Sequence, residues 1–271
     1  MLSEADFAFV TREVKARSGA MMGRDASALA EARLAPLARR EGYGSVSELI
    51  THAKIKPDGK LWSAIADSLT QTETRFFRDR AMFAHLRKDI LPELFARRSG
   101  ERLRVWCAGC GTGQEAYSLA MILEELRDEG AAGAELYATD FSERLLGKAR
   151  SGLYTQFEVQ RGLPIRKLIA YFEKAGDLWR ISDRLRASVR FHNHNLLDPP
   201  GAIGPFDLVL CCNVLSGFDA PTRLATLARL SETMASDGVL ILGQSEPLPE
   251  GIAGFSDAGR CFVKTPAARA A

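Results

Sequence analysis

The sequence predicts an α/β protein with two domains. A small all-α domain is expected over residues 1–70, followed over 71–266 by a doubly wound, mostly parallel sheet with a small inserted β-subdomain at 152–192. Three observations support this division. The first 70 residues carry helix-start signals and no strand pattern, and from residue 102 short apolar runs alternate with helical patterns. At 271 residues, 46% of them hydrophobic, the chain is long enough to bury such a core.

Four short helices are expected in the N-terminal domain. A serine or aspartate stands where each would begin, and such side chains accept hydrogen bonds from the free N–H groups of a first turn. These residues are Ser3, Asp25, Ser45 and Asp58. Residues 70–83 are polar and then aromatic, which indicates a linker that runs into a further helix ending at Gly100.

Four apolar runs are predicted as buried strands of one sheet. They are RVWCAG (104–109), ELYATD (135–140), FDLVLCCN (206–213) and GVLILG (238–243). Helical spacing of leucines and isoleucine predicts a helix over 116–126 between the first two strands.

The inserted subdomain at 152–192 interrupts this alternation. A helix is expected around 165–172, followed by strand-like runs at 177–182 and 187–191. Insertions at the ends of strands often carry partner recognition, so the segment is a candidate docking element.

Composition excludes several classes of protein. Charged residues make up 26% of the chain and the net charge is only +2, which excludes a disordered chain and gives no reason to expect a nucleic-acid partner. No run approaches the ~18–20 apolar residues of a membrane span, so no membrane insertion is expected. The N-terminus MLSEADFAFV carries acids where a secretory signal carries basic residues.

The cysteine pattern favours a reducing, cytoplasmic setting. The five cysteines are odd in number and four of them fall in close pairs, unlike a secreted disulfide framework. Cys107 and Cys110 form a CxxC, but it lies in a glycine-rich turn and nothing completes a zinc set. No metal is predicted, although a redox or metal cluster with Cys211 and Cys212 stays open.

A glycine-rich turn, GCGTGQE at 109–115, stands between a predicted strand and a predicted helix. Gly109, Gly111 and Gly113 allow a tight turn and close approach of a ligand to the backbone. A dinucleotide fingerprint would have glycine at position 114, where this chain has Gln114. The turn is therefore better suited to S-adenosylmethionine, which has a sugar, a base and an amino acid but no pyrophosphate.

Acidic and amide side chains support this cofactor. Glu115 follows the turn, and Asp140 ends the second predicted strand, where it is placed for ribose hydroxyls or an amino group. Asn213 follows the third predicted strand, at the edge where open α/β sheets bind ligands.

In order along the chain, these pieces resemble the chemotaxis receptor methyltransferase (CheR) family. The resemblance rests on TETRFFRD (72–79), RVWCAGCGTGQEAYSLA (104–120), ATD (138–140), KARSGLY (148–154), NLLD (195–198), FDLVLCCNVLSGFD (206–219) and DGVLILGQSE (237–246). It implies a class I, Rossmann-like methyltransferase domain behind a small helical domain. It also implies methyl transfer from S-adenosylmethionine, with S-adenosylhomocysteine as product, to glutamates in the cytoplasmic region of transmembrane chemoreceptors. A monomer is expected.

The resemblance also implies site residues. Arg78 is the candidate catalytic cation. The cofactor would contact Thr72, Thr74, Arg78, Gly109, Gly111, Glu115, Asp140, Asn195, Leu196, Cys212 and Asn213. Thr72 stands where the family usually has asparagine.

Two positions depart from the family pattern. Cys212 and Gly217 replace an arginine and a tyrosine that line the family's cleft near the methyl group. The expected result is a larger cleft that lacks one cation. A catalytically impaired relative that binds S-adenosylmethionine and acts as a regulatory or partner-binding module therefore stays open as the alternative.

Overall fold

The computed structural model describes residues 2–56, 58–70, 73–201, 203–249, 254–257 and 261–264. The chain divides into two compact units. The first contains Met1–Thr72 and Ser216–Arg223, and the second contains Glu73–Leu215 and Leu224–Ala271.

The first unit is helical, with helices α1 (Glu4–Ser18), α2 (Ser27–Arg40), α3 (Val46–Ile55) and α4 (Gly59–Leu69). Ser3, Ser45 and Asp58 cap α1, α3 and α4 as predicted, each accepting a backbone N–H of the first turn. Asp25 does not cap α2, which begins at Ser27 without a side-chain cap. Residues 216–223, predicted to belong to the sheet domain, cluster with these helices: the Met21 N–H donates to the Gly217 carbonyl at 2.9 Å.

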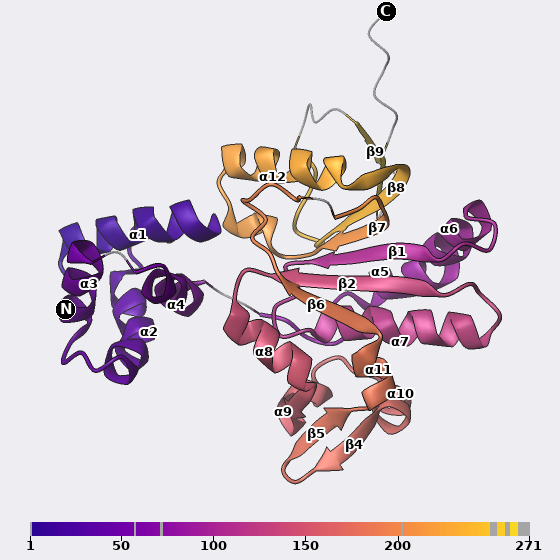
Figure 1. Ribbon diagram of the computed structural model, residues 1–271, viewed down its shortest axis with the longest axis horizontal. Coiled ribbons are helices and arrows are strands. Elements are labelled where there is room, and N and C mark those ends of the chain that lie inside the picture. Colours follow the sequence, from indigo (N-terminus) through magenta and orange to yellow (C-terminus); the bar gives the residue numbers. More distant parts are fainter. Residues whose placement is uncertain are drawn as a thin grey trace, which may run out of the picture. The chain divides into compact units, whose positions relative to one another are not determined.

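A seven-stranded sheet forms the centre of the second unit (Figure 1), in the order β6-β2-β1-β7-β8-β10-β9. Its strands are β1 (Leu103–Ala108), β2 (Ala134–Asp140), β6 (Val189–Asn193), β7 (Phe206–Cys211), β8 (Met234–Leu242), β9 (Phe255–Asp257) and β10 (Phe262–Lys264). The five strands from β6 to β8 are parallel, and β10 and β9 pair antiparallel. The predicted α/β fold with a mostly parallel sheet is confirmed.

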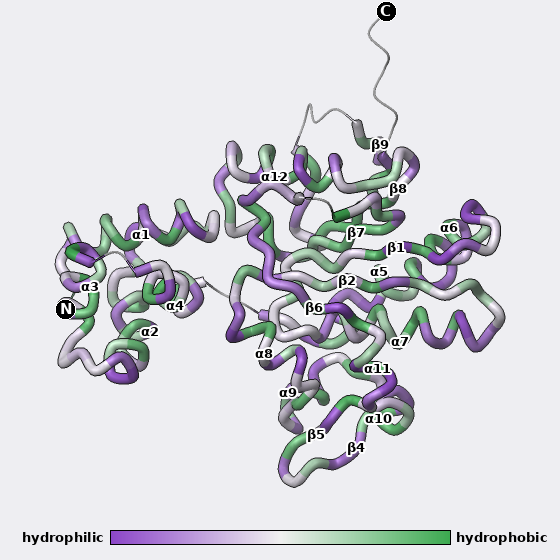
Figure 2. The backbone as a smooth tube through the Cα atoms, viewed as in Figure 1, coloured by the Kyte–Doolittle hydropathy of each residue, from purple (hydrophilic) through white to green (hydrophobic). Residues whose placement is uncertain are grey.

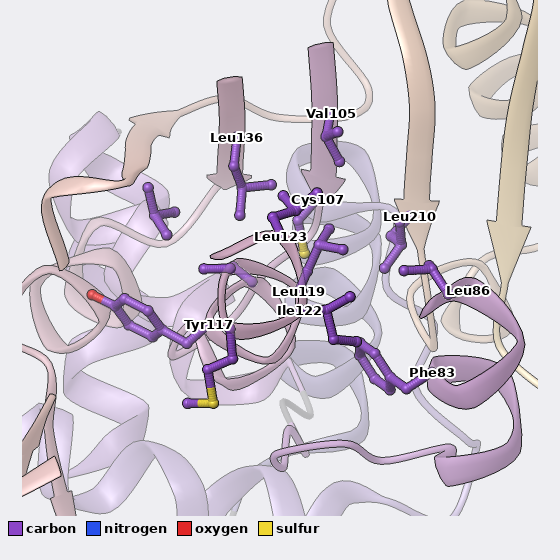
Figure 3. Close-up of a cluster of buried hydrophobic side chains, with 14 of the residues drawn as sticks. Phe83, Leu86, Val105, Cys107, Tyr117, Leu119, Ile122, Leu123, Leu136 and Leu210 are labelled. Atoms are coloured by element: carbon purple, nitrogen blue, oxygen red, sulfur yellow. The ribbon is translucent and has the colours of Figure 1, made fainter. Parts of the chain in front are cut away.

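One face of the sheet carries the main core, against helix α7 (Gln114–Asp128) and the segment α5 (Arg80–His85), π-helix η1 (Leu86–Ile90) and α6 (Leu91–Arg97). Figure 3 shows Leu119 and Ile122 of α7 beside Cys107 of β1 and Leu210 of β7. Helix α12 (Ala220–Glu232) follows β7, and its buried side chains in the second unit include Leu227 and Leu230. The central strand β7 is mostly hydrophobic along its length, whereas the edge strand β6 is mostly hydrophilic (Figure 2).

The inserted segment begins after helix α8 (Glu143–Ser151) and has a sheet of its own, in the order β3-β5-β4. Its elements are β3 (Leu153–Thr155), α9 (Gln156–Gln160), α10 (Ile165–Tyr171), β4 (Phe172–Ala175), β5 (Leu178–Ile181) and α11 (Asp183–Ala187). The run at 187–191 was expected in this insertion, but it forms β6 and pairs parallel with β2 in the main sheet, with Leu136 opposite Val189. In the described ranges, no helix is long and apolar enough to cross a membrane.

Candidate functional site

The candidate site lies where the strand order of the main sheet reverses. The chain runs from β1 outward to β2 and β6 on one side, and then returns to β7 and β8 on the other. Ligands of open α/β sheets bind outside the carboxyl ends of the strands at such a point. The turn after β1, Asp140 at the end of β2 and Asn213 after β7 therefore share one edge.

The glycine turn depends on backbone conformations that side chains rarely adopt. Gly109, Gly111 and Gly113 have φ angles of 73°, 55° and 90°. A Cβ atom at Gly109 would lie 2.4 Å from Cγ2 of Val214, so only glycine fits there. Gly113 precedes α7 directly, and the first N–H groups of this helix face the edge of the sheet.

Asp140 holds the glycine turn in place. Its Oδ2 accepts the N–H of Gly111 and its Oδ1 accepts the N–H of Ser142, both at 2.9 Å. The side chain is buried. A carboxylate at this edge is of the chemical type that binds a ligand hydroxyl or amino group.

The loop after β6 lies against the end of β2. The N–H of His194 donates to the backbone carbonyl of Asp140 at 3.1 Å. Asn195 accepts the N–H of Leu197 through Oδ1 at 3.1 Å, and Leu196 is buried. This arrangement brings Asn195 and Leu196 to the same edge as the glycine turn.

Glu115 is a buried carboxyl on the first turn of α7. Burial raises its pKa to about 7; the positive charge of Arg78 lowers the pKa and the negative charge of Glu246 raises it. Within the described part of the chain, no hydrogen bond to this carboxyl is found. A buried acid whose pKa is raised by desolvation is a candidate site for a cationic ligand.

Glu246 is a residue of this site that the sequence did not predict. Its Oε2 accepts the N–H of Asn213 at 2.5 Å and the N–H of Gly243 at 3.0 Å. Asn213 has a φ angle of 61°, which is uncommon for asparagine, and the Glu246 carboxylate stabilises that turn. Glu246 lies in DGVLILGQSE (237–246), one of the segments that resemble the family. Nothing in that segment identifies the backbone N–H groups that the Glu246 carboxylate accepts.

The segment that begins at Glu73 supplies the other predicted residues; Thr72 lies outside the described residues. The hydroxyl of Thr74 is buried and has no hydrogen-bond partner in the described residues, as expected of a group that awaits a ligand. The N–H of Phe77 donates to Oγ of Ser118 on α7 at 3.0 Å, which ties the segment to α7. Arg78 donates to the backbone carbonyl of Glu73 and lies close enough to Glu115 to affect its pKa.

A cavity of about 430 Å³ opens beside this segment. Among the described residues, four arginines line it together with a single acid, Asp79, and the remaining lining comes from Phe77, Gly162 and Gln244. Asp79 is engaged as the cap of α5, where its Oδ1 accepts the N–H of Met82 at 2.9 Å. The cavity is therefore strongly cationic.

Cys212 differs from its expected place in the cleft. Its side chain belongs to the main hydrophobic core, with its sulfur 3.9 Å from the carbonyl oxygen of Ile241. Gly217, the other departure, is exposed and clusters with the helical unit. Burial raises the pKa of the Cys107, Cys110, Cys211 and Cys212 thiols, so these thiols are protonated near neutral pH and poorly reactive. Among the described residues, no group of His, Cys, Asp and Glu side chains could hold a metal ion.

These residues fit S-adenosylmethionine. The cofactor carries a sulfonium and an ammonium group, and the buried carboxyls of Glu115, Asp140 and Glu246 share the edge where it would lie. The Thr74 hydroxyl is buried and has no hydrogen-bond partner among the described residues, so it is available to such a ligand.

Comparisons with known proteins identify the family of this chain. The family model described as "CheR methyltransferase, SAM binding domain" matches residues 72–259. The chain is 35% identical to Chemotaxis protein methyltransferase Cher2 of Pseudomonas putida over 235 residues, covering 85% of this chain and 86% of the relative. It is also 35% identical to Chemotaxis protein methyltransferase 1 of Pseudomonas aeruginosa over 251 residues, covering 91% of each chain. The chain therefore belongs to the CheR family and is a methyltransferase that uses S-adenosylmethionine.

Proposed function

We propose that this methyltransferase acts on glutamate side chains in the cytoplasmic region of chemoreceptors and forms glutamyl methyl esters. The cationic cavity that Arg78 lines is the observation that supports it most directly. Arginine binds carboxylates with two parallel hydrogen bonds, so a cavity with several arginines suits a carboxylate acceptor. The relatives named above are chemotaxis protein methyltransferases, which supports a chemoreceptor as the protein that carries the acceptor.

The reaction requires alignment more than acid–base chemistry. When bound, S-adenosylmethionine supplies an electrophilic methyl group. A glutamate carboxylate is ionised near pH 7, so no residue needs to remove a proton from it. The protein has to exclude water and hold the carboxylate in line with the methyl group. Such alignment can lower the activation free energy by several kcal/mol.

Arg78 is the residue we assign to the acceptor carboxylate. It lines the cavity and acts electrostatically on Glu115, so it bridges the acceptor side and the cofactor side of the site. Thr74, Glu115, Asp140, Asn195, Leu196 and Asn213 are assigned to the cofactor, together with the backbone at Gly109 and Gly111. Thr72 and Cys212 stay as proposals from the family resemblance. For Cys212, the core position of the thiol leaves only its backbone and β-carbon as candidate contacts.

The test is transfer of labelled methyl from S-adenosylmethionine to chemoreceptor-containing membranes. Label in the receptor that is released by mild base identifies an ester. Arg78→Ala should lower the turnover number by about 10²–10³, and it should weaken binding of S-adenosylhomocysteine much less. Label that is stable to base, or no receptor label with folded protein, would contradict the proposal.

A further inference from the structure

The glycine turn is held from the inserted subdomain as well as from β2. The hydroxyl of Tyr154, on β3, donates to the backbone carbonyl of Thr112 at 2.7 Å. The N–H of the same peptide unit, which belongs to Gly113, donates to the Cys110 carbonyl at 2.9 Å. Because a peptide unit is planar, these two hydrogen bonds fix the orientation of the Thr112–Gly113 peptide at both of its ends.

Tyr154 lies directly against the start of α7. A Cβ atom at Gly113 would lie 3.3 Å from the hydroxyl oxygen of Tyr154. Gly113 is the residue before α7, and Glu115 stands on the first turn of that helix. The peptide that Tyr154 holds therefore sets the direction in which the chain enters α7, and with it the position of the Glu115 backbone.

Packing fixes the ring of Tyr154. The side chain is buried, and its ring centroid lies 5.0 Å from that of Phe76 and 6.4 Å from that of Phe172, both in edge-to-face contact. Phe76 belongs to the segment that carries Thr74 and Arg78, and Phe172 begins β4. Burial raises the pKa of the Tyr154 phenol, so its hydroxyl stays protonated and remains a donor to the turn.

A second buried tyrosine forms the same kind of hydrogen bond away from the turn. The hydroxyl of Tyr117 on α7 (Figure 3) donates to the backbone carbonyl of Ala149 on α8 at 2.8 Å. The ring centroid of Tyr117 lies 6.4 Å from that of Tyr154. The two tyrosines are both buried and both donate to a backbone carbonyl, so they differ mainly in which segment they hold.

We propose that Tyr154 is a positioning residue for the cofactor: its hydroxyl holds the Thr112–Gly113 peptide in the orientation in which the glycine turn and the first turn of α7 receive S-adenosylmethionine. The inserted subdomain then supports the cofactor site through β3, besides being a candidate docking element. This role rests on the proposed function, in which Gly111 and Glu115 contact the cofactor.

The test compares Tyr154→Phe with Tyr117→Phe, since each variant removes one hydroxyl and keeps the ring. Calorimetry with S-adenosylhomocysteine should give a dissociation constant about tenfold higher for Tyr154→Phe than for wild type, as for loss of one buried hydrogen bond. Tyr117→Phe should bind as wild type does. Urea unfolding shows that both variants are folded, and a purely structural role of Tyr154 would lower only the unfolding midpoint.

Two further measurements separate positioning from general loosening. In receptor methylation, Tyr154→Phe should raise KM for S-adenosylmethionine and leave KM for the receptor fragment unchanged. In amide hydrogen exchange of the free protein, the N–H groups of residues 109–115 should exchange faster in Tyr154→Phe and at the wild-type rate in Tyr117→Phe.

Two results would overturn the role of Tyr154. Equal affinity of wild type and Tyr154→Phe, with binding still weakened in Glu115→Gln, would show that the turn binds the cofactor without this hydroxyl. Equal weakening in the two tyrosine variants would assign the effect to looser packing around α7.

Failure of the proposed function gives different results. If neither Tyr154→Phe nor Glu115→Gln changes the affinity, the proposed cofactor contacts at this edge are wrong, and the role of Tyr154 is wrong with them. Absence of label in the receptor would contradict the proposed acceptor alone, because the affinity comparison needs no acceptor.

Discussion

The buried acids at the two ends of strand β7 have different surroundings. At its amino end, Asp207 is bound by Arg98 at 2.6 Å and accepts the N–H of Arg104 at 2.8 Å. Arg98 also pairs with Asp237 at 2.7 Å, and this pairing lowers the pKa of Asp237. The charges at this end neutralise one another, so this end is built for stability.

At the carboxyl end of β7, the acids have different neighbours. Glu246 accepts backbone N–H groups, Asp140 does the same at the end of β2, and burial raises the pKa of Glu115. The Glu115 carboxyl is unfavourable to ionise in the free protein and becomes favourable to ionise when a cation binds. Asp207 therefore serves the fold, whereas the ionisation of Glu115 is coupled to a cationic ligand.

The largest effect is expected at the amino end. Asp207→Asn should lower the free energy of unfolding by about 3 kcal/mol, because it leaves the mostly buried Arg98 without its closest partner. Asp237→Asn removes the more exposed partner of the same arginine and should cost less than about 1 kcal/mol. Urea unfolding measures both values. Equal losses from the two variants would contradict the assignment of Asp207 as the principal partner.

The next largest effect is expected on ligand binding at the carboxyl end of β7. Glu115→Gln should weaken binding of S-adenosylhomocysteine by about 10- to 100-fold, since a charge-assisted hydrogen bond contributes about 1.5–3 kcal/mol. The same variant should be no less stable in urea, because an amide is cheaper to bury than an ionised acid. Glu129→Gln, on the exposed end of α7, is the control for net charge. Calorimetry that shows the same affinity for Glu115→Gln and wild type would remove Glu115 from the cofactor site.

The pH dependence of stability and of ligand binding gives a further test of the role of Glu115. The ordinary pKa of glutamate is 4.5 and that of Glu115 is about 7, so the native protein holds this proton over a range in which the unfolded chain has released it. The stability that Glu115 contributes to the free protein is therefore complete below pH 4.5 and is lost as the pH rises through 7.

Ligand affinity changes with pH in the opposite direction, because the ammonium group of the ligand pairs with the ionised carboxylate of Glu115. The dissociation constant of S-adenosylhomocysteine should fall about tenfold from pH 6 to pH 8. In Glu115→Gln this change should be absent; a wild-type profile that is equally flat would show that Glu115 does not titrate against the ligand.

The sequence predicted the main sheet well, because its strands are apolar runs bounded by turn residues. It did not predict β3 and β4, which are three and four residues long and carry no clear alternation. It also assigned residues 187–191 to the insertion, because the parallel pairing of β6 with β2 joins residues about fifty positions apart and leaves no local pattern. Such pairings are decided by packing between distant segments.

The site could be predicted only in part. Strand ends are visible in the sequence, so the acids and amides at the sheet edge could be named. The partners of Glu246 and the clustering of arginines around the cavity depend on tertiary contacts. The orientation of Cys212 could have been predicted, however. Alternation along β7 places position 212 on the same face as Leu208 and Leu210, which pack in the core.

The smallest effect on ligand binding is expected from Cys212→Arg, which would give the carboxyl end the kind of cation that Arg98 supplies at the amino end. Burial and the charge of Glu115 both raise the pKa of the Cys212 thiol, so charge at one of these positions acts on the other. A guanidinium there favours the ionised carboxyl, so the midpoint of the pH profile for S-adenosylhomocysteine binding should move down by about one pH unit. Cys212→Met is the matched control, since it adds bulk to the core without charge and should leave the midpoint unchanged. If the arginine and methionine variants have the same midpoint, Glu115 is not the group whose ionisation sets the pH profile of ligand binding. The difference between the two ends of β7 then does not depend on Glu115.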